Sequence, residues 1–345
     1  MSPKKSVGVV LFQLGGPDSL ESIEPFLLNL FRDPDIIDFP FAKIAREPFA
    51  RLISSSRAKR VRHHYAQLGG KSPILEFTQR QAAALQVVLR TICEAEVHIA
   101  MRYWHPYTKE AVRSLEHHGP EEIVLLPLYP QYSKTTTGSS LNEWNRQIQT
   151  SRLRHVPTRV VTAFYDDPGY IHAVVKRIDQ TLARFPRSEE VHLIFSAHSV
   201  PLSIIQRGDP YQMQIEKTVE LVLQHGRWTY PHTICYQSKV GASKWLQPSL
   251  RDTLRQLSLQ TTRNVLVIPI AFVSDHVETL VEINHEARKE AYRQGICRFE
   301  MMPGLNDSPD FINALAGLVL GKPFQVSTAG HQGLKPAAQA CCAGL

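Results

Sequence analysis

The residue types best suited to chemistry lie in two short segments of the chain. Residues 196–201 read SAHSVP around His198, and residues 274–280 read SDHVETL around Glu278. A neutral imidazole can accept a proton near pH 7, and a carboxylate can accept another or bind a divalent cation. The two segments therefore indicate proton transfer or metal handling. From position alone, a histidine bonded only to its own loop is an equally good interpretation of His198.

Three glutamates extend the second segment at intervals of four residues. On a helix, Glu278, Glu282 and Glu286 share one face, where like charges repel one another. A solvated surface would explain such a stripe on an arbitrary helix. The nearby imidazoles of His276 and His285 favour a second interpretation, in which carboxylate oxygens hold a divalent ion loosely along a path through the protein.

Both segments follow predicted β-strands. Apolar runs alternate with helix-like segments, a pattern typical of parallel βαβ units with helices on both faces of a sheet. In such folds ligands bind outside the carboxyl ends of the strands, which is where His198 and Glu278 stand. The predicted helices cover about residues 76–94, 107–118, 211–225 and 276–293. The predicted strands are Val7–Leu14, Val97–Tyr103, Ile123–Tyr129, Arg159–Phe164, Val191–Phe195, His232–Tyr236 and Asn264–Ile270.

The two halves of the chain resemble each other. VLLPLYPQYS at 124–133 and VLVIPIAFVS at 265–274 share a strand, a proline, an aromatic residue and a final serine. We therefore expect an α/β protein of two similar Rossmann-like domains, each with a doubly wound parallel sheet, at residues 1–163 and 164–320. Residues 321–345 contain few large apolar side chains and are predicted to form a disordered tail.

Composition narrows the class of protein. The 345 residues are 43% hydrophobic and carry a formal net charge of +7, which suits anionic ligands or an anionic surface. The chain has no nucleic-acid-binding motif, so we expect no nucleic acid partner. It also lacks CxxC, HExxH and GxSxG motifs and complete nucleotide-binding loops. The odd count of five cysteines, a short polar N-terminus and the lack of a long apolar run predict a cytoplasmic protein.

Residues 25–53 combine apolar clusters with basic side chains. Pro34, Pro40 and Pro48 interrupt this segment, so we expect short helical pieces and no long helix. Apolar groups beside cations suit shallow docking on an anionic bilayer. Closure of the segment over the core or over a ligand is the alternative.

Eight motifs together resemble the ferrochelatase family, and they occur in that family's order over roughly residues 7–320. The resemblance implies two similar domains with a porphyrin cleft between them. It also implies an enzyme that inserts ferrous iron into protoporphyrin IX to form haem, and the bacterial members fit best. The motifs are LGGPD (14–18), LGGKSPI (68–74), RYWHP (102–106), YPQYSKTTTGSSL (129–141), SAHSVP (196–201), RGDPY (207–211), QSKVG (237–241) and SDHVETL (274–280).

The resemblance also implies roles for individual residues. His198 matches the family's active-site histidine and Glu278 its partner across the porphyrin, both as catalytic residues and as metal ligands. Glu282 and Glu286 match the acidic line that leads away. Asp275, which could otherwise cap a helix, and His276 match the network behind the site. The positions that match porphyrin contacts are Leu14, Arg57, Tyr65, Ser72, Arg102, Tyr103, Tyr129, Tyr211, Trp245 and Phe272.

No permanently bound cofactor is expected, since ferrous iron is a substrate. Animal members of the family hold a two-iron two-sulfur cluster with four cysteines, one of them in the YPQYS block. Here that block contains Lys134, and the C-terminal region offers only Cys341 and Cys342. Two alternatives remain open, a chelatase for cobalt or nickel with another tetrapyrrole and a haem carrier on the same fold. A carrier would need an axial ligand but no acidic line.

Overall fold

The computed structural model describes residues 5–36, 42–186, 189–238 and 244–321. It contains two parallel four-stranded sheets with the same strand order, which confirms the predicted α/β fold of two similar halves. The first sheet has the order β2-β1-β3-β4, from β1 (Ser6–Gln13), β2 (Glu94–Met101), β3 (Glu122–Pro127) and β4 (Thr158–Val160). The second has the order β6-β5-β7-β8, from β5 (His192–His198), β6 (His232–Gln237), β7 (Asn264–Pro269) and β8 (Arg298–Met301).

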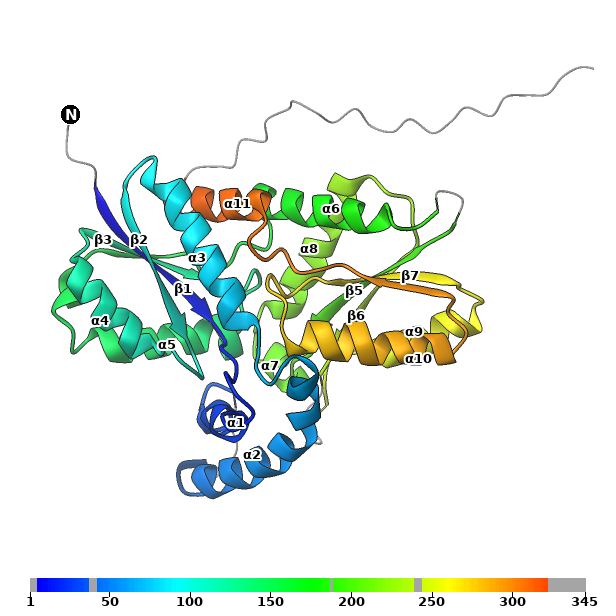
Figure 1. Cartoon of the computed structure of the whole chain (residues 1–345), viewed down its shortest axis with the longest axis horizontal. Helices are drawn as coiled ribbons and strands as arrows, with labels where there is room; N and C mark the ends of the chain where they lie inside the picture. Colours follow the sequence, from blue (N-terminus) through cyan, green and yellow to red (C-terminus); the bar gives the residue numbers. More distant parts are fainter. Residues whose placement is uncertain (1–4, 37–41, 187–188, 239–243, 322–345) are drawn as a thin grey trace, which may run out of the picture.

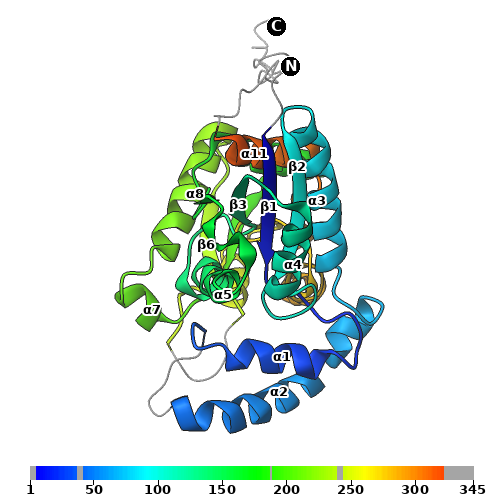
Figure 2. The ribbon, with the colours of Figure 1, turned by 90° about the vertical axis from the view of Figure 1, so that its left-hand side faces the viewer.

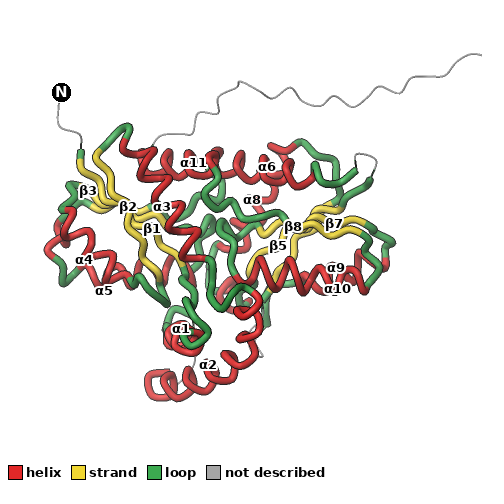
Figure 3. Tube along the Cα trace, viewed as in Figure 1, coloured by secondary structure: helices red, strands yellow, loops and turns green. Residues whose placement is uncertain are grey.

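Helices cover both sheets, as Figure 3 shows by the red segments around the yellow strands. The α-helices are α1 (Ile23–Arg32), α2 (Ala42–Gln67), α3 (Ile74–Arg90), α4 (Thr108–His118), α5 (Ser139–Ile148), α6 (Pro168–Leu182), α7 (Leu202–Gln206), α8 (Tyr211–Gly226), α9 (Leu250–Leu259), α10 (Arg288–Arg293) and α11 (Pro309–Leu320). Two π-helices, η1 (Lys134–Gly138) and η3 (Glu278–Ala287), and the 3₁₀-helix η2 (Arg152–His155) complete the described elements.

One apolar cluster joins the two halves. It contains Leu11 and Leu126 from the first sheet, Phe195 and Leu266 from the second, and Phe311 from α11. Helix α11 packs on both α3 and α6, so the last described helix crosses back to the first half (Figure 1). Because burial of this shared apolar surface is the main favourable term in folding, the two sheets are held in a fixed relation at the level of the site.

Two sequence predictions differ from the observed elements. The observed strand β4 is shorter than the predicted strand Arg159–Phe164 and begins one residue earlier. No strand was predicted at the position of β8. Both β4 and β8 are edge strands, with three and four residues. Such short segments carry too few residues to show a period of two, so their pairing is decided by the neighbouring strand.

The segment that was expected to break into short pieces contains a 26-residue helix. Helix α2 continues through Pro48, so the prediction that this proline ends a helix is wrong. Proline keeps a helix-compatible φ and removes one backbone N–H, and the many turns that follow Pro48 retain theirs. Pro34 does follow the end of α1, and Pro40 lies outside the described residues. Figure 2 shows α1 and α2 as a separate layer across one end of the molecule.

Candidate active site

His198 and Glu278 form a direct pair. His198 is the last residue of the central strand β5, and Glu278 is the first residue of η3. The imidazole Nδ1 lies 2.9 Å from the carboxylate Oε2 of Glu278. The His198 side chain is 38% exposed and that of Glu278 18% exposed. The carboxylate is thus half-enclosed, while the imidazole keeps one face open to a ligand.

The helix that carries the glutamates is a π-helix, whereas the sequence predicted an ordinary helix over residues 276–293. Its wider turn is visible where the Arg288 N–H donates to the carbonyl of Ile283, five residues back. A step of four residues is slightly more than one full turn of an α-helix and slightly less than one full turn of a π-helix. The glutamates at intervals of four therefore still follow one side of the helix, and the α-helical form resumes at α10.

Asp275 anchors the start of this helix. Its carboxylate accepts hydrogen bonds from the Thr279 hydroxyl, the Gly304 N–H and the Asn306 amide, at 2.9 to 3.1 Å. The Asp275 N–H also donates to the Asn306 side chain. These contacts tie the start of η3 to the loop before α11. Among the described contacts the Asp275 carboxylate accepts no backbone N–H of η3, so the alternative prediction that Asp275 caps this helix is not confirmed.

His276 supports Glu278 from the other side. Its Nδ1–H donates to the Ser274 carbonyl at 3.1 Å, which directs Nε2 towards Glu278 Oε1 at 3.8 Å. Phe272 lies between the two imidazoles, with ring centroids 6.3 Å from His198 and 4.7 Å from His276. The Glu278 carboxylate is therefore flanked by two imidazoles that an aromatic ring keeps apart.

Ser238 links two of the glutamates, and sequence reasoning did not assign it a role. Its hydroxyl lies 3.0 Å from Glu278 Oε2 and 2.8 Å from Glu282 Oε2. One hydroxyl proton can serve only one carboxylate, so a second proton held on Glu282 would satisfy all three groups. Ser238 stands in the QSKVG motif, but only the observed pairing of His198 with Gln237, the residue before Ser238, shows that the serine lies beside the histidine.

The charges of these groups are coupled. Burial lowers the pKa of His198, but the negative charges of Glu278 and Glu282 outweigh it and raise that pKa above its ordinary value. Burial raises the pKa of Glu278, yet the two imidazoles outweigh it and hold that pKa well below its usual range. Burial and the charge of Glu278 raise the pKa of Glu282 to about 7. Both shifts favour the ionic form of the His198–Glu278 pair, and a pKa of about 7 allows Glu282 to gain or lose a proton near neutral pH.

Helix α2 contributes Arg57 and Tyr65 to the same region. The positive charge of Arg57 acts on Tyr65, His198 and Glu282. Tyr65 is buried, and burial together with the charges of Glu278 and Glu282 raises the pKa of its phenol. Both side chains thus lie within electrostatic reach of the glutamates, although they come from the opposite half of the chain.

Three other residues predicted to contact the porphyrin also make contacts within the protein near the site. The Tyr211 hydroxyl donates to the His198 carbonyl at 3.0 Å. Trp245 forms a β-bridge with Pro201, directly after the histidine loop. Ser72 packs against Gly16, where an added Cβ would lie 2.6 Å from the serine. Its Oγ accepts the Ile74 N–H at the start of α3, so Ser72 has a local structural contact as well as its predicted one.

Arg102 and Tyr103 meet a carboxylate that the sequence analysis missed. Asp33 is fully buried, accepts the Tyr103 hydroxyl at 2.6 Å, and forms an ion pair with Arg102 at 2.9 Å. Ser139 also donates to this carboxylate. Burial raises the pKa of Asp33, but these partners outweigh it and lower that pKa. The network fastens the end of α1 to the loop after β2, and no local sequence pattern marks Asp33.

The predicted residues therefore fall into connected groups. Glu286 lies further along η3 and contacts His64 of α2. Leu14, Tyr65 and Tyr103 share one apolar cluster with α1, and Tyr129 lies half-buried in the neighbouring cluster under the first sheet. The group around the imidazole–carboxylate pair consists of Arg57, Tyr65, His198, Tyr211, Ser238, Phe272, His276, Glu278 and Glu282.

Solved structures with this architecture define the class of protein. SirB from Bacillus subtilis, solved with Fe3+, superposes with a TM-score of 0.53 at 11% identity, covering 92% of this chain and 96% of that one. DR2241 from Deinococcus radiodurans, described as similar to chelatases, gives a TM-score of 0.51 at 12% identity over 93% of this chain and 56% of that one. At these identities the likeness concerns the fold, which is that of the chelatases.

Sequence comparison identifies the family within that class. A family profile described as Ferrochelatase matches residues 6–322. The ferrochelatase of Aquifex aeolicus is 47% identical over 315 residues, covering 90% of this chain and 98% of the relative. That of Nostoc sp. is 44% identical over 332 residues, 94% of this chain and 85% of the relative. The chain belongs to the ferrochelatase family and is a porphyrin metal chelatase.

Proposed function

We propose that this chain inserts ferrous iron into protoporphyrin IX and that His198 and the glutamates of η3 carry the reaction. The single observation that supports this most directly is the His198–Glu278 pair at 2.9 Å, continued by Glu282 through Ser238. It combines a proton acceptor with carboxylates that attract a divalent cation. We take protoporphyrin in preference to another tetrapyrrole because the LGGPD and YPQYS blocks resemble protoporphyrin-using members.

The reaction exchanges two pyrrole N–H protons for one Fe2+. A planar porphyrin hides its nitrogen lone pairs, so the site must bind a bent macrocycle, and this strain is drawn from the remaining binding energy. Leu14, Phe272 and Trp245 offer apolar or aromatic surface to such a ligand. We assign anion contacts with its propionates to Arg57, Tyr65 and Ser72, and further contacts to Arg102, Tyr103, Tyr129 and Tyr211.

The proton balance of the site follows from its electrostatics. In the resting state the glutamates stabilise the imidazolium form of His198, which cannot accept a proton. A divalent cation near Glu278 and Glu282 offsets their negative charge, so it lowers the pKa of His198 and releases a proton from Glu282. The imidazole then becomes neutral and can accept the first pyrrole proton. The carboxylates accept the second or pass it towards solvent.

An anaerobic turnover assay tests this function. The protein is mixed with protoporphyrin IX and ferrous iron, and formation of haem is followed by its absorbance. Coproporphyrin with iron, and another tetrapyrrole with cobalt or nickel, are run beside it. Haem formation from protoporphyrin at the highest rate supports the proposal. Haem binding without any metalation would instead identify a carrier, and preference for cobalt or nickel would identify the related chelatase.

We further propose that the purified protein holds no iron–sulfur cluster. Lys134 begins η1 at the block where animal members supply a cysteine, and Cys93 and Cys235 are buried in separate places. Cys341, Cys342 and the predicted tail lie outside the described residues. Anaerobically purified protein should contain no stoichiometric acid-labile sulfide, and finding one equivalent of cluster sulfide would overturn this proposal.

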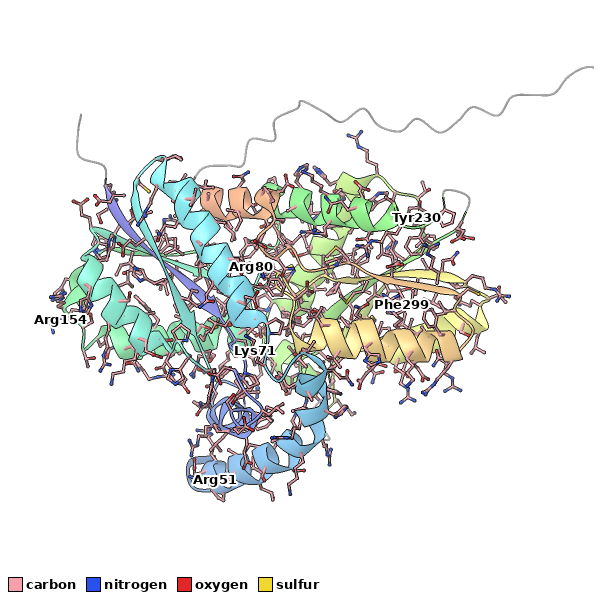
Figure 4. All side chains as sticks on the ribbon, viewed as in Figure 1. Arg51, Lys71, Arg80, Arg154, Tyr230 and Phe299 are labelled. Carbon is pink, nitrogen blue, oxygen red and sulfur yellow. The ribbon has the colours of Figure 1, made fainter. Side chains whose placement is uncertain are left out.

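We also propose that α2 docks on an anionic bilayer. No helix in the described ranges is long and apolar enough to cross a membrane. However, α2 exposes Leu52 (73%) and Phe49 (40%), and the basic Arg51, Lys59 and Arg60 are exposed on the same helix. Figure 4 shows Arg51 at the end of the molecule opposite α6 and α11. Apolar groups flanked by cations bind shallowly at anionic interfaces.

Flotation with vesicles tests the docking proposal. The protein should float with anionic vesicles at low salt and less at high salt, because screening weakens the attraction. Leu52→Glu should abolish flotation. Leu259→Glu is the matched control, since Leu259 is 79% exposed but lies on α9. No flotation of the unmodified protein at low salt, or equal loss in both variants, would refute docking through α2.

A further inference from the structure

Asp209 connects the loop that follows β3, in the first half of the chain, to the start of α8 in the second half. Its Oδ2 atom accepts the N–H of Lys134 at 2.7 Å and the hydroxyl of Ser133 at 3.1 Å. Its Oδ1 atom accepts the N–H of Tyr211, the first residue of α8, at 3.0 Å. We propose that Asp209 is a positioning residue that couples this loop to His198 and fixes the histidine for proton transfer. This inference rests on the proposed function for the role of His198.

Tyr211 extends this connection to the active site. Asp209 holds its backbone N–H, and its buried side chain donates a hydrogen bond from the hydroxyl to the carbonyl of His198 at 3.0 Å. The segment between His198 and Tyr211 contains the short helix α7 and turns at Gly208, which has a φ of 90°. The tyrosine hydroxyl therefore joins the two ends of this segment, so a displacement at the start of α8 moves the backbone of the histidine.

Two further hydrogen bonds dock the same loop on α8. The N–H of Tyr132 donates to the side-chain carbonyl of Gln214 at 2.7 Å, and the amide of Gln131 donates to the hydroxyl of Thr218 at 3.0 Å. Gln214 and Thr218 are four residues apart and therefore share one face of the helix. Gln131 and Thr218 are buried, where the loss of a partner is unfavourable. The loop and the first turns of α8 should therefore move as one unit.

The same loop is joined to the side chains assigned to the porphyrin. Tyr129 lies at its start, and Ser139, directly after η1, accepts a hydrogen bond from Nε of Arg102 at 2.7 Å. Tyr129 and Arg102 are both predicted porphyrin contacts. A macrocycle bound against them would restrain the loop, and Asp209 would pass that restraint to Tyr211. Reactions are sensitive to such positioning, since a misplacement of about 1 Å can lower the rate about a hundredfold.

An aspartate suits this position because hydrogen-bond donors approach both of its carboxylate oxygens. An asparagine has the same size but only one accepting oxygen, so either orientation of its amide turns the NH2 group towards a donor. Asp209→Asn therefore breaks one side of the connection with little change in volume. Ser133→Ala removes one donor from the first half, and it provides a readout if Asp209→Asn does not fold.

The test separates positioning from binding. In the full-length protein, kcat and the KM for Fe2+ are measured anaerobically, the Kd for protoporphyrin is measured by fluorescence, and circular dichroism checks folding. The matched control is Asp167→Asn, because the Asp167 carboxylate likewise accepts a backbone N–H at the start of a helix, from Tyr170 of α6 at 2.8 Å. The variants are Asp209→Asn, Ser133→Ala, Tyr211→Phe, the double substitution Asp209→Asn/Tyr211→Phe, and His198→Ala.

We expect Asp209→Asn to lower kcat about tenfold to a hundredfold, while the KM for Fe2+ and the Kd for protoporphyrin stay within about twofold. Ser133→Ala should lower kcat to a lesser degree. The double variant should lose no more than the more impaired of its two single variants, because both substitutions act through the same contact with His198. The Asp167→Asn control should behave as the unmodified protein.

Four results would overturn the positioning role. They are an unchanged kcat in Asp209→Asn, a loss that appears mainly in the Kd or the KM, losses that add in the double variant, and an equal loss in the Asp167→Asn control. If His198→Ala still loses metalation, each of these results leaves the proposed function intact. Full turnover in His198→Ala would instead refute the proposed role of His198 and this inference with it.

Discussion

Substitution of Glu278 by glutamine tests the electrostatic account of the active site. The change keeps the shape and a hydrogen bond to His198 but removes the negative charge at 2.9 Å from Nδ1. With that charge gone, burial becomes the dominant influence on the imidazole. The pKa of His198 should therefore fall from its raised value to below the ordinary one.

The size of this effect can be bounded. Unit charges about 4 Å apart interact by about 4 kcal/mol at an effective dielectric constant of about 20, equivalent to about three pH units. The His198 side chain is 38% exposed, so solvent screens much of this interaction. The His198 pKa should therefore fall, by less than this unscreened interaction implies. Catalysis should drop by more than about a hundredfold, since the metal path loses its innermost charge.

The assay is an NMR titration of the His198 ring protons beside the pH profile of residual activity. Glu220→Gln, on the exposed face of α8, is the matched control. In the Glu278 variant both the NMR midpoint and the acidic limb of the profile should move to lower pH, whereas the control should leave both in place. A His198 midpoint that stays where it is in the unmodified protein would refute the reasoning, even if activity were lost.

The other predictions concern the groups around this pair. His198→Ala should fold and bind porphyrin but lose nearly all metalation; activity within about tenfold, or ~1.4 kcal/mol of barrier, would remove it from the central role. Glu282→Gln should mainly weaken apparent iron affinity, and an equal loss of rate at saturating iron in this variant and in Glu278→Gln would contradict that division. Ser238→Ala should lower the rate and shift its pH dependence, because the hydroxyl between the two carboxylates is lost; an unchanged pH profile would exclude the link. Asp33→Ala should destabilise the fold by about 3–5 kcal/mol in urea unfolding at pH 7, because it leaves Arg102 without its buried partner. Folding lowers the pKa of Asp33. The stability that its carboxylate contributes is therefore fully present above the unfolded pKa of about 3.9 and is lost as the pH falls through the folded pKa. The difference in unfolding free energy between Asp33→Ala and the unmodified protein should accordingly shrink in acid.

Much of the architecture could be predicted from local sequence. Buried parallel strands require continuous apolar runs, and these runs were visible in β1, β3, β5 and β7. Residues that follow such strands lie at the ligand-binding edge, so His198 and Glu278 could be chosen before their contact was known. The motif resemblance then indicated the family, which the comparisons confirmed. The division into residues 1–163 and 164–320 stays a prediction.

Only the tertiary structure shows which residues far apart in the sequence contact one another. His64 and Glu286 are 222 positions apart, and Arg102 and Asp33 are 69 apart, so no periodicity or short motif relates them. The π-helical form of η3 and the passage of α2 through Pro48 also depend on packing and anchoring that propensity does not contain. Sequence by itself determined which residue types stand at the strand ends, because the alternation of apolar runs is local. Strand order and register determined which of them touch, because those contacts form only when the two sheets and the α1–α2 layer pack together.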